Sequence, residues 1–456
     1  MNVPKSIFRE YDVRGVIGSQ LTPEFARALG RAFGTIAWER MGRMPRLAVG
    51  RDNRPSGASL CQAVRAGLVD SGAFVIDVGE LPTPALYFAV QHLGTDGALQ
   101  VTGSHNPAEF NGFKMVLAGD SVHGAAIADL YEMIVKEEWR TGAGQERADA
   151  SVLPAYREAI LAHHRLARPV RVVVDCGNGV ASLIAISTLE AMGAEVTPLF
   201  ADSDGTFPNH HPDPTVPENL VDLRRVVRNT GAELGIAFDG DGDRIGAVDE
   251  TGDIIFGDLL LIIFGRDAIR RFGPGIPVIF DVKCSDLLPA ALTRAGARPE
   301  MWKTGHSLIK ARMKETGAPL AGEMSGHLFF GGDWFGFDDA LFAAARLLEI
   351  VGSGPPGLHR LLDDLPRTST TPEIRVDCSD DAKFGVVARA AEYFAARYPV
   401  NTIDGVRIAF ADGWGLLRAS NTQPILVLRF EAINPAALEA YRGEVTGWLA
   451  AQGITA

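Results

Sequence analysis

The chain has 456 residues, of which 46% are hydrophobic and 22% are charged, and its formal net charge is -12 at pH 7. These values are typical of a soluble globular protein with about two to four domains. The negative charge argues against nucleic acid as the main ligand, because no basic run offsets it. A small anionic ligand is still compatible with that charge, because salt screens charges separated by more than about 8 Å.

Targeting and membrane signals are weak throughout the chain. The N-terminal stretch MNVPKSIFREYD has no apolar core of the kind found in secretory signals. The longest strongly apolar run, residues 259–264, is much shorter than the roughly 18 residues that a membrane span needs. The four cysteines are far apart and form no CxxC pair: Cys61, Cys176, Cys284 and Cys378. We therefore expect a reduced, cytoplasmic protein without a membrane partner.

The first clear element is a helix that begins after Thr22, a residue that can cap it, with Pro23 in the first turn. Its apolar face is formed by Phe25, Leu29, Phe33 and Ile36. A short apolar strand at the start of residues 46–56 then ends in a charged loop. Ser56 is expected to cap the following helix, which should end at Gly72.

A strand that ends in a polar loop recurs three times, with an aspartate at each strand exit: Asp52, Asp175 and Asp281. In each unit a helix, another strand and a second distinctive loop follow: TGSHNP (102–107), DGDGDR (239–244) and GEMSGH (322–327). This pattern predicts three divergent copies of a βαβ-type unit whose loops share one edge of a sheet. Chance similarity between α/β units is the alternative.

The C-terminal part is different. Residues 366–378 predict a hinge and a strand, residues 382–397 a helix, and residues 406–432 hairpin strands around the loop RASNTQP. Asn434 should begin a final helix, so this part reads as a small α+β domain. Linker-like composition predicts four domains, at residues 1–150, 151–252, 253–367 and 368–456.

Two loops carry the strongest chemical signals. Ser104 lies in a tight polar loop after the apolar strand GALQV, although a serine that only bonds its own turn is an alternative. Asp239, Asp241 and Asp243 alternate with glycines after the strand LGIAF, which predicts an oxygen site for a hard divalent cation. An EF-hand is rejected, because Arg244 stands where that loop needs glycine and strands flank the motif.

Weaker signals lie elsewhere. Lys283 follows a strand, and His306 follows a glycine at a helix start. In GEMSGH, acceptors and a hydroxyl suit neighbouring sugar hydroxyls: Glu323, Ser325 and His327. In RASNTQP, a guanidinium, hydroxyls and backbone N–H groups predict a phosphate cradle: Arg418, Ser420, Asn421 and Thr422. Ordinary turns would explain both loops as well. The stretch DCGNGVAS resembles a dinucleotide fingerprint, but Ser182 replaces its third glycine.

Taken together, TGSHNP, DGDGDR, GEMSGH and RASNTQP occur in this order over the whole chain and resemble the α-D-phosphohexomutases. Longer stretches, WKTGHSLIK, WFGFDD and PNHHPDP, resemble the bacterial phosphomannomutase/phosphoglucomutase branch of that family. The resemblance implies an α/β fold, in which three related mixed α/β domains and a smaller C-terminal α+β domain surround a central cleft. It also implies a phosphoserine at Ser104 and Mg2+ at Asp239, Asp241 and Asp243, with a phosphoserine oxygen completing the site.

The implied reaction interconverts hexose 1-phosphate and hexose 6-phosphate through phospho-Ser104 and a hexose 1,6-bisphosphate, which also serves as activator. The resemblance assigns roles to further residues in groups. Tyr11 and Arg14 would line the cleft. The candidates for general acid and base are Lys114, His306 and Arg14. Arg244 and Lys283 would stabilise the transferring group and ligand, and Glu323 and Ser325 would hold sugar O3 and O4.

Recognition through O3 and O4 would accept both C2 epimers, glucose and mannose. Phosphoglucosamine mutase is an alternative, but that branch carries glutamine where this chain has Met324. A phosphosugar-binding protein without turnover is the other alternative. We expect a monomer whose partners are small sugar phosphates.

Overall fold

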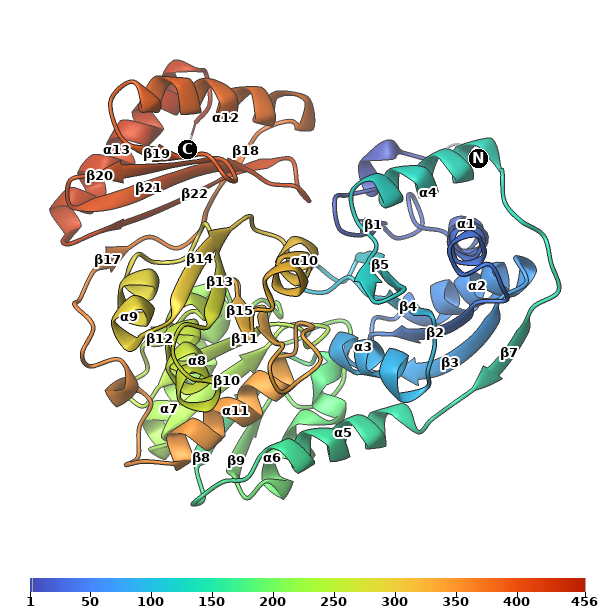
Figure 1. Cartoon of the computed structure of the whole chain (residues 1–456), viewed down its shortest axis with the longest axis horizontal. Helices are drawn as coiled ribbons and strands as arrows, with labels where there is room; N and C mark the ends of the chain where they lie inside the picture. Colours follow the sequence, from blue (N-terminus) through green and yellow to red (C-terminus); the bar gives the residue numbers. More distant parts are fainter. Residues whose placement is uncertain (2, 456) are drawn as a thin grey trace. The chain divides into compact units, whose positions relative to one another are not determined.

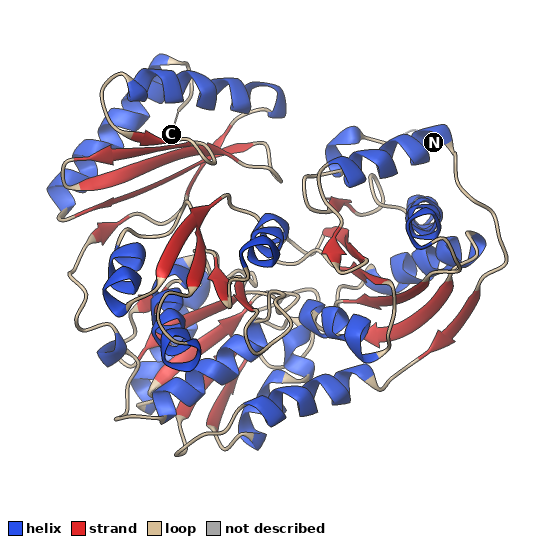
Figure 2. Ribbon diagram, in the orientation of Figure 1, coloured by secondary structure: helices blue, strands red, loops and turns tan. Residues whose placement is uncertain are grey.

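The computed structural model describes every residue except 2 and 456. The chain forms two compact units, drawn in Figures 1 and 2. The first unit contains Met1–Leu260 and Ser325–Arg360, and the second contains Leu261–Met324 and Leu361–Ala456. Both segments that carry the strongest chemical signals, the Ser104 loop and the DGDGDR loop, therefore belong to the first unit.

The first sheet of the first unit has the strand order β1-β5-β4-β2-β3-β7, and β6 pairs with β5. Its strands are β1 (Val13–Val16), β2 (Arg46–Arg51), β3 (Phe74–Glu80), β4 (Gly97–Val101), β5 (Phe110–Leu117), β6 (Asp120–Ser121) and β7 (Gln145–Ala148). Its helices are η1 (Lys5–Ile7), α1 (Pro23–Met41), α2 (Gly57–Asp70), α3 (Thr83–His92) and α4 (Ala125–Lys136). Figure 1 shows α1 and α2 on one face of this sheet and α3 on the other.

Helices α1 and α2 pack unusually closely because glycine faces backbone at their contact. A Cβ atom on Gly30 would lie 2.2 Å from the carbonyl oxygen of Val64, and one on Gly67 would lie 2.0 Å from that of Arg27. Beneath them, fully buried aromatic side chains such as Phe25, Phe33 and Phe113 fill the core.

The second sheet of the first unit has the order β12-β11-β10-β8-β9. Its strands are β8 (Arg171–Asp175), β9 (Glu195–Leu199), β10 (Leu234–Phe238), β11 (Ile245–Asp249) and β12 (Ile254–Ile255). The accompanying elements of this unit are α5 (Val152–His163), η2 (Val180–Leu183), α6 (Ala185–Ala191), η3 (Pro217–Leu220), α7 (Val221–Thr230), β16 (Leu328–Phe330) and α11 (Ala340–Gly352). Asp339 caps α11, since its side chain accepts a hydrogen bond from the Phe342 N–H.

In the second unit, β13 (Pro277–Asp281) lies between β14 (Arg298–Trp302) and β15 (Leu320–Gly322). A separate antiparallel sheet has the order β17-β22-β21-β20-β19, and β18 pairs with β22. Its strands are β17 (Ser369–Thr370), β18 (Ile374–Asp377), β19 (Val400–Asn401), β20 (Val406–Phe410), β21 (Gly413–Ala419) and β22 (Ile425–Ala432). The further helices of this unit are α9 (Leu287–Ala295), α10 (His306–Thr316), α12 (Asp380–Ala395) and α13 (Pro435–Ala451), and the chain passes from one unit to the other within α8 (Gly257–Phe272) and η4 (His359–Leu361). Figure 2 shows α12 and α13 on the same face of the antiparallel sheet.

The predicted repeat is confirmed by the strand order. In each copy the first strand is central and is flanked by parallel neighbours from later in the copy: β3-β2-β4, β9-β8-β10 and β14-β13-β15. Chance similarity would not reproduce the same order three times. The fold is therefore three related α/β domains followed by a C-terminal α+β domain, as expected.

Parallel pairing also explains which loops meet. Arg51 pairs with Val101, so the loop after β2 lies beside the Ser104 loop after β4. Phe280 pairs with Gly322, so the loop after β13 lies beside the start of GEMSGH. The carboxyl ends of parallel neighbours share one edge, which is where α/β proteins place their ligand sites.

Some of the predicted helix caps are confirmed by the structure and one is wrong. Thr22 and Asn434 cap their helices through side-chain hydrogen bonds to Phe25 N and Ala437 N, as expected. The prediction that Ser56 caps α2 with its side chain was wrong, because its Oγ accepts a hydrogen bond from Asn111 instead. Directly before the expected domain boundary after residue 150, β7 adds a parallel edge strand to β3.

Candidate active site

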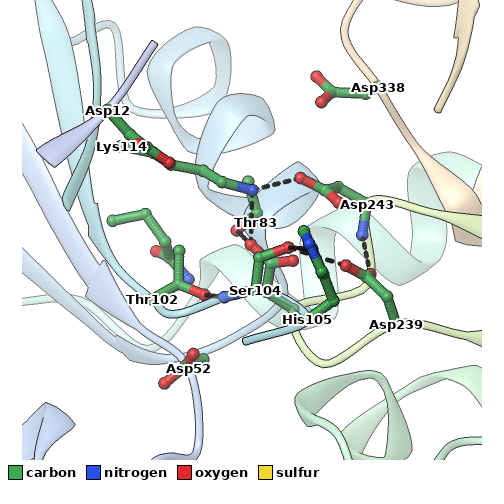
Figure 3. A network of polar contacts seen from close by, with 12 residues as sticks. Asp12, Asp52, Thr83, Thr102, Ser104, His105, Lys114, Asp239, Asp243 and Asp338 are labelled. Carbon is green, nitrogen blue, oxygen red and sulfur yellow. Dashed lines mark hydrogen bonds and ion pairs between the residues drawn. The ribbon is translucent and has the colours of Figure 1, made fainter. Parts of the chain in front are cut away.

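Ser104 lies in the loop between β4 and β5 and has the left-handed backbone conformation, with φ of 48°. Its backbone N–H donates to Thr102 Oγ1 at 2.8 Å, which helps to hold this uncommon conformation. Its Oγ donates to Asp239 Oδ2 at 2.9 Å and lies 3.2 Å from His105 Nδ1 (Figure 3). The hydroxyl of the first repeat thus meets a carboxylate of the second.

Asp239, Asp241 and Asp243 lie in the tight connection between β10 and β11, and all three are fully buried. One carboxylate oxygen of each lies within 4.8 Å of those of the other two. Burial, together with the charges of Asp243 and Asp241, raises the pKa of Asp239 well above its usual range. Such a cluster is electrostatically costly unless positive charge is placed close to it.

Positive charge reaches the cluster from β5. Lys114 Nζ donates to Asp241 Oδ2 at 2.8 Å and to Asp243 Oδ2, as Figure 3 shows for Asp243. Thr83, at the start of α3, donates its hydroxyl to Asp241 Oδ2 at 2.6 Å. Although burial opposes it, the charge of Lys114 lowers the pKa of Asp243 well below its usual range. A lysine, a serine and a threonine from the first domain therefore hold the aspartate loop of the second.

The donor set fits a hard divalent cation. Oδ1 of Asp241 is buried and has no hydrogen-bond partner among the described residues. A buried carboxylate oxygen without a partner is costly, and a cation of the Mg2+ type would coordinate it. Three carboxylates with a hydroxyl 2.9 Å from one of them offer the oxygen ligands that such an ion prefers.

His327 reaches the same cluster from the segment before β16. Its Nε2 lies 3.3 Å from Asp243 Oδ1 and accepts a hydrogen bond from Arg244 Nε at 3.2 Å. Asp338 Oδ2 lies 4.0 Å from the same nitrogen. Gly326 permits this approach, because it has φ of 89° and a Cβ there would lie 2.2 Å from Ile245 O. The second half of GEMSGH, Ser325 to His327, is thereby joined to the end of DGDGDR.

Arg14 is brought to the Ser104 loop from β1. Its Nη1 donates to Asn106 Oδ1 at 2.6 Å, and its Nη2 donates to Asp12 Oδ2 at 2.7 Å. Tyr11 is buried next to Asp12 in the sequence. These contacts place one more cation beside the hydroxyl loop.

The second unit assembles its own group of candidates around Asp281. This carboxylate accepts hydrogen bonds from Thr304 Oγ1 at 2.9 Å and Met324 N at 3.1 Å, and Lys283 Nζ lies 3.9 Å from it. Glu323 accepts a hydrogen bond from Gly305 N at 2.6 Å, directly before His306. Lys283, His306 and Glu323, which are 40 residues apart at most, therefore lie on adjoining loops.

The RASNTQP loop joins β21 to β22. Arg418 is buried and pairs with Asp404 at 3.1 Å. Ser420 Oγ accepts hydrogen bonds from the backbone N–H groups of Thr422 and Gln423 at 3.3 and 3.1 Å. The loop is thus closed on itself by its own serine, and Asn421 lies at its tip.

Four family models match in chain order and cover most of the sequence. They describe the phosphoglucomutase/phosphomannomutase alpha/beta/alpha domains I, II and III at residues 5–141, 154–252 and 256–368, and the C-terminal domain at residues 373–447. The chain belongs to the phosphoglucomutase/phosphomannomutase family.

Individual members of the family are similar over nearly the full length. A phosphomannomutase/phosphoglucomutase of Pseudomonas aeruginosa is 50% identical over 441 residues, which cover 96% of this chain and 94% of that protein. A phosphoglucomutase of Neisseria gonorrhoeae is 46% identical, covering 96% and 95%. A crystal structure of a family protein from Burkholderia thailandensis has a TM-score of 0.91 at 45% identity, covering 99% of this chain and 98% of that one.

The family fold also accounts for the dinucleotide-like stretch DCGNGVAS. A Cβ on Gly179 would lie 2.9 Å from the carbonyl oxygen of Gly240, so this glycine allows the loop to pack on the aspartate loop.

Among residues 1 and 3–455, no helix combines the length and apolar character that crossing a bilayer requires.

Several residues of this family member's site were not singled out from the sequence. Thr83 and Asp338 carry no local signal, since their contacts to the aspartate loop join distant segments. Asp52 and Asp281 were noticed only as strand-exit acids, although both hold neighbouring loops through backbone N–H groups. The repeat itself was the signal that could have assigned them this role.

Proposed function

We propose that this protein is a phosphomannomutase/phosphoglucomutase, an isomerase that reversibly interconverts the 1- and 6-phosphates of mannose and glucose. Relatives with nearly 50% identity carry these names. The observation that carries the proposal is the 2.9 Å contact between Ser104 Oγ and Asp239 Oδ2, because it places a lone hydroxyl against the acidic cluster. The protein acts as a monomer in the cytoplasm on small sugar phosphates.

Mg2+ is the proposed metal, held by Asp239, Asp241, Asp243 and an oxygen on Ser104. The bound ion would neutralise charge on the transferring phosphoryl group. The carboxylates position that charge beside Ser104, and Lys114 and Arg244 add further positive charge around it.

Phospho-Ser104 is the proposed donor. The bond between phosphorus and Ser104 Oγ breaks while phosphorus bonds the free hydroxyl oxygen of a hexose phosphate. The proton of that hydroxyl passes to a general base, and a general acid protonates the released Ser104 Oγ. The candidates for general acid and base are Lys114, His306 and Arg14. The hexose 1,6-bisphosphate then turns, and Ser104 takes the phosphoryl group from the other end, so the serine is phosphorylated again after each turnover.

The remaining candidates bind the substrate. Glu323, Ser325 and His327 would hold the sugar hydroxyls, and Tyr11, Lys283 and His306 would line the sugar and phosphate path. A phosphate at the non-reacting end would bind the RASNTQP loop: Arg418, Ser420, Asn421 and Thr422. Because the bisphosphate turns, that loop must accept the phosphate in both orientations.

A coupled assay tests the proposal with Mg2+, a trace of glucose 1,6-bisphosphate, and glucose, mannose or glucosamine 1-phosphate as substrate. We expect turnover of glucose and mannose phosphates, and much slower turnover of the glucosamine phosphate. Intact mass before and after phosphatase should reveal one phosphoryl group, located on Ser104 by peptide mapping. Binding of sugar phosphates without turnover of any of them would instead support the binding-protein alternative.

A further inference from the structure

Arg54 is a fully buried arginine in the loop after β2, and its side chain has 0% exposure. Its Nε donates to Asp52 Oδ2 at 3.2 Å. The other four donor positions are directed at backbone carbonyl oxygens of the Ser104 loop: Pro107 at 2.6 Å, Phe110 at 3.0 Å, Ser104 at 2.8 Å and Asn106 at 2.5 Å. A guanidinium has five N–H donors, so every one of them is used.

The acceptors of Arg54 lie either in the loop that contains Ser104 or on Asp52, which also binds that loop. Asp52, the partner of Arg54, also accepts a hydrogen bond from Gly103 N at 3.2 Å. The guanidinium and this carboxylate therefore form hydrogen bonds with the loop on both sides of Ser104. The four carbonyls lie between residue 104 and residue 110, so one guanidinium holds most of the loop.

The guanidinium is also closely packed. A Cβ atom on Gly103 would lie 2.5 Å from Nε and 2.6 Å from Cζ, so a larger residue there would push on the guanidinium. The ring of Phe207 lies near the group, with its centroid 5.0 Å from Cζ. Phe207 comes from the second domain, which also carries the aspartate cluster.

A buried charge of this kind is costly, and an apolar side chain would fill the same space at lower cost. An apolar side chain, however, could not form hydrogen bonds with four carbonyl oxygens at once. Ser104 itself has φ of 48°, a conformation that a residue with a side chain keeps only when its surroundings impose it. Arg54 supplies that constraint directly, through the carbonyl oxygen of Ser104.

We propose that Arg54 is a positioning residue for the phosphoryl-transfer reaction. It holds Ser104 in its left-handed conformation, so that Oγ stays at hydrogen-bonding distance from Asp239. This inference rests on the proposed function, because it assumes that Ser104 carries the transferred group. Arg54 itself touches only protein groups in the described structure, so its effect passes through the loop.

The test is Arg54→Lys, which keeps the positive charge but offers at most three donors without the planar fork. We expect kcat of the Mg2+-loaded enzyme to fall about 100-fold, since a displacement of about 1 Å of a reacting group can have that effect. KM for glucose 1-phosphate should stay close to the wild-type value, because the proposed sugar contacts lie on other loops. Hydrogen exchange should accelerate in residues 103–111 and not in the aspartate loop.

Arg168→Lys is the matched control. Arg168 also donates to backbone carbonyls, those of Pro169 and Gly354, and pairs with Glu233, but none of these groups belongs to the proposed site. We expect its kcat to remain at the wild-type value. If Arg54→Lys is folded and lowers kcat no more than Arg168→Lys does, the positioning role is wrong.

Gly103→Ala decides the matter if Arg54→Lys does not fold. The added methyl pushes on the guanidinium from the loop side and should reproduce the fall in kcat and the local exchange. A wild-type kcat in this variant would overturn the proposal. Failure of the proposed function would be seen separately, because the wild-type protein would then gain no phosphoryl group from glucose 1,6-bisphosphate. The hydrogen-exchange measurement would still show whether Arg54 holds the Ser104 loop in place.

Discussion

Ser104 Oγ and Asp239 Oδ2 are 2.9 Å apart although 135 residues separate them in the chain. The two residues follow corresponding strands, β4 and β10, in two copies of the same repeat. Each copy ends its third strand at the sheet edge where loops gather, and packing of the two copies brings those edges together. The pair is therefore a product of the repeat, in which one copy contributes a hydroxyl and the other a carboxylate cluster.

Replacing the hydroxyl tests its proposed chemical role. Ser104→Ala should lower kcat at least about 1,000-fold, because removal of an attacking group leaves only the contribution of the remaining site. Binding of glucose 1-phosphate, measured by calorimetry, should persist. Ser187→Ala is the control and should be fully active, because it removes a helix serine hydroxyl that donates to Ile184 O, away from the proposed site. Near-wild-type turnover of Ser104→Ala would remove Ser104 from the mechanism.

Removing one carboxylate tests the metal site without reference to turnover. Asp241→Asn should weaken Mn2+ binding by at least about 10-fold, because even the loss of a group that only contacts a metal ligand has an effect of this size. Electron paramagnetic resonance measures the binding of Mn2+. Asp249→Asn is the matched control, since Asp249 is equally buried but, among the described residues, accepts hydrogen bonds only in its own turn and from His359. Equal affinities in the two variants would place the cation elsewhere.

The sequence predicted the parts of the site that depend on residues close together in the chain. An apolar strand followed by a polar loop identifies each repeat, and parallel pairing then dictates that loops such as those of Asp52 and Ser104 share an edge. The three aspartates were predictable because carboxylates spaced so closely between glycines repel one another unless a cation lies between them. Helix caps with side-chain oxygens, such as Thr22, were predictable for the same reason of locality.

Contacts between segments that are far apart in the sequence could not be predicted. Ser56 has the composition of a cap, but Asn111 from β5 takes its hydroxyl. Thr83 and Arg54 look like ordinary loop residues, and only the packed structure shows that they hold Asp241 and Ser104. Such partners are chosen by three-dimensional proximity, for which a single sequence holds no periodic signal.

Lys114 should matter most when the metal is absent. Its ammonium group bridges Asp241 and Asp243, so Lys114→Met should destabilise the metal-free protein by about 3 kcal/mol, the usual cost of leaving a buried charge without its partner. Mg2+ should then raise the melting temperature of the variant more than that of the wild type. Lys383→Met removes another buried ammonium, paired with Asp380, and its loss of stability should not respond to Mg2+. An equal Mg2+ response in all three proteins would contradict this account.

His210 should give the stability of the protein a pH dependence. Its Nδ1 faces His211 O at 2.9 Å and its Nε2 faces both oxygens of Asp175 at 3.1 and 3.2 Å. Since both ring nitrogens face acceptors, the protonated imidazolium form, which donates from both, is favoured. Burial opposes this, but the hydrogen bond and the charge of Asp175 raise the pKa of His210 above its usual value of 6.5.

A group whose pKa is raised by folding stabilises the protein below its unfolded pKa, and this stabilisation is lost as the pH rises through the folded value. The melting temperature of the wild type should therefore exceed that of His210→Gln by more at about pH 6 than at about pH 9. The effect should reach the aspartate loop, because His210 borders Gly177 and Gly179 packs on Gly240. A difference that does not change with pH would mean that His210 is neutral and that one of its acceptors turns away in solution.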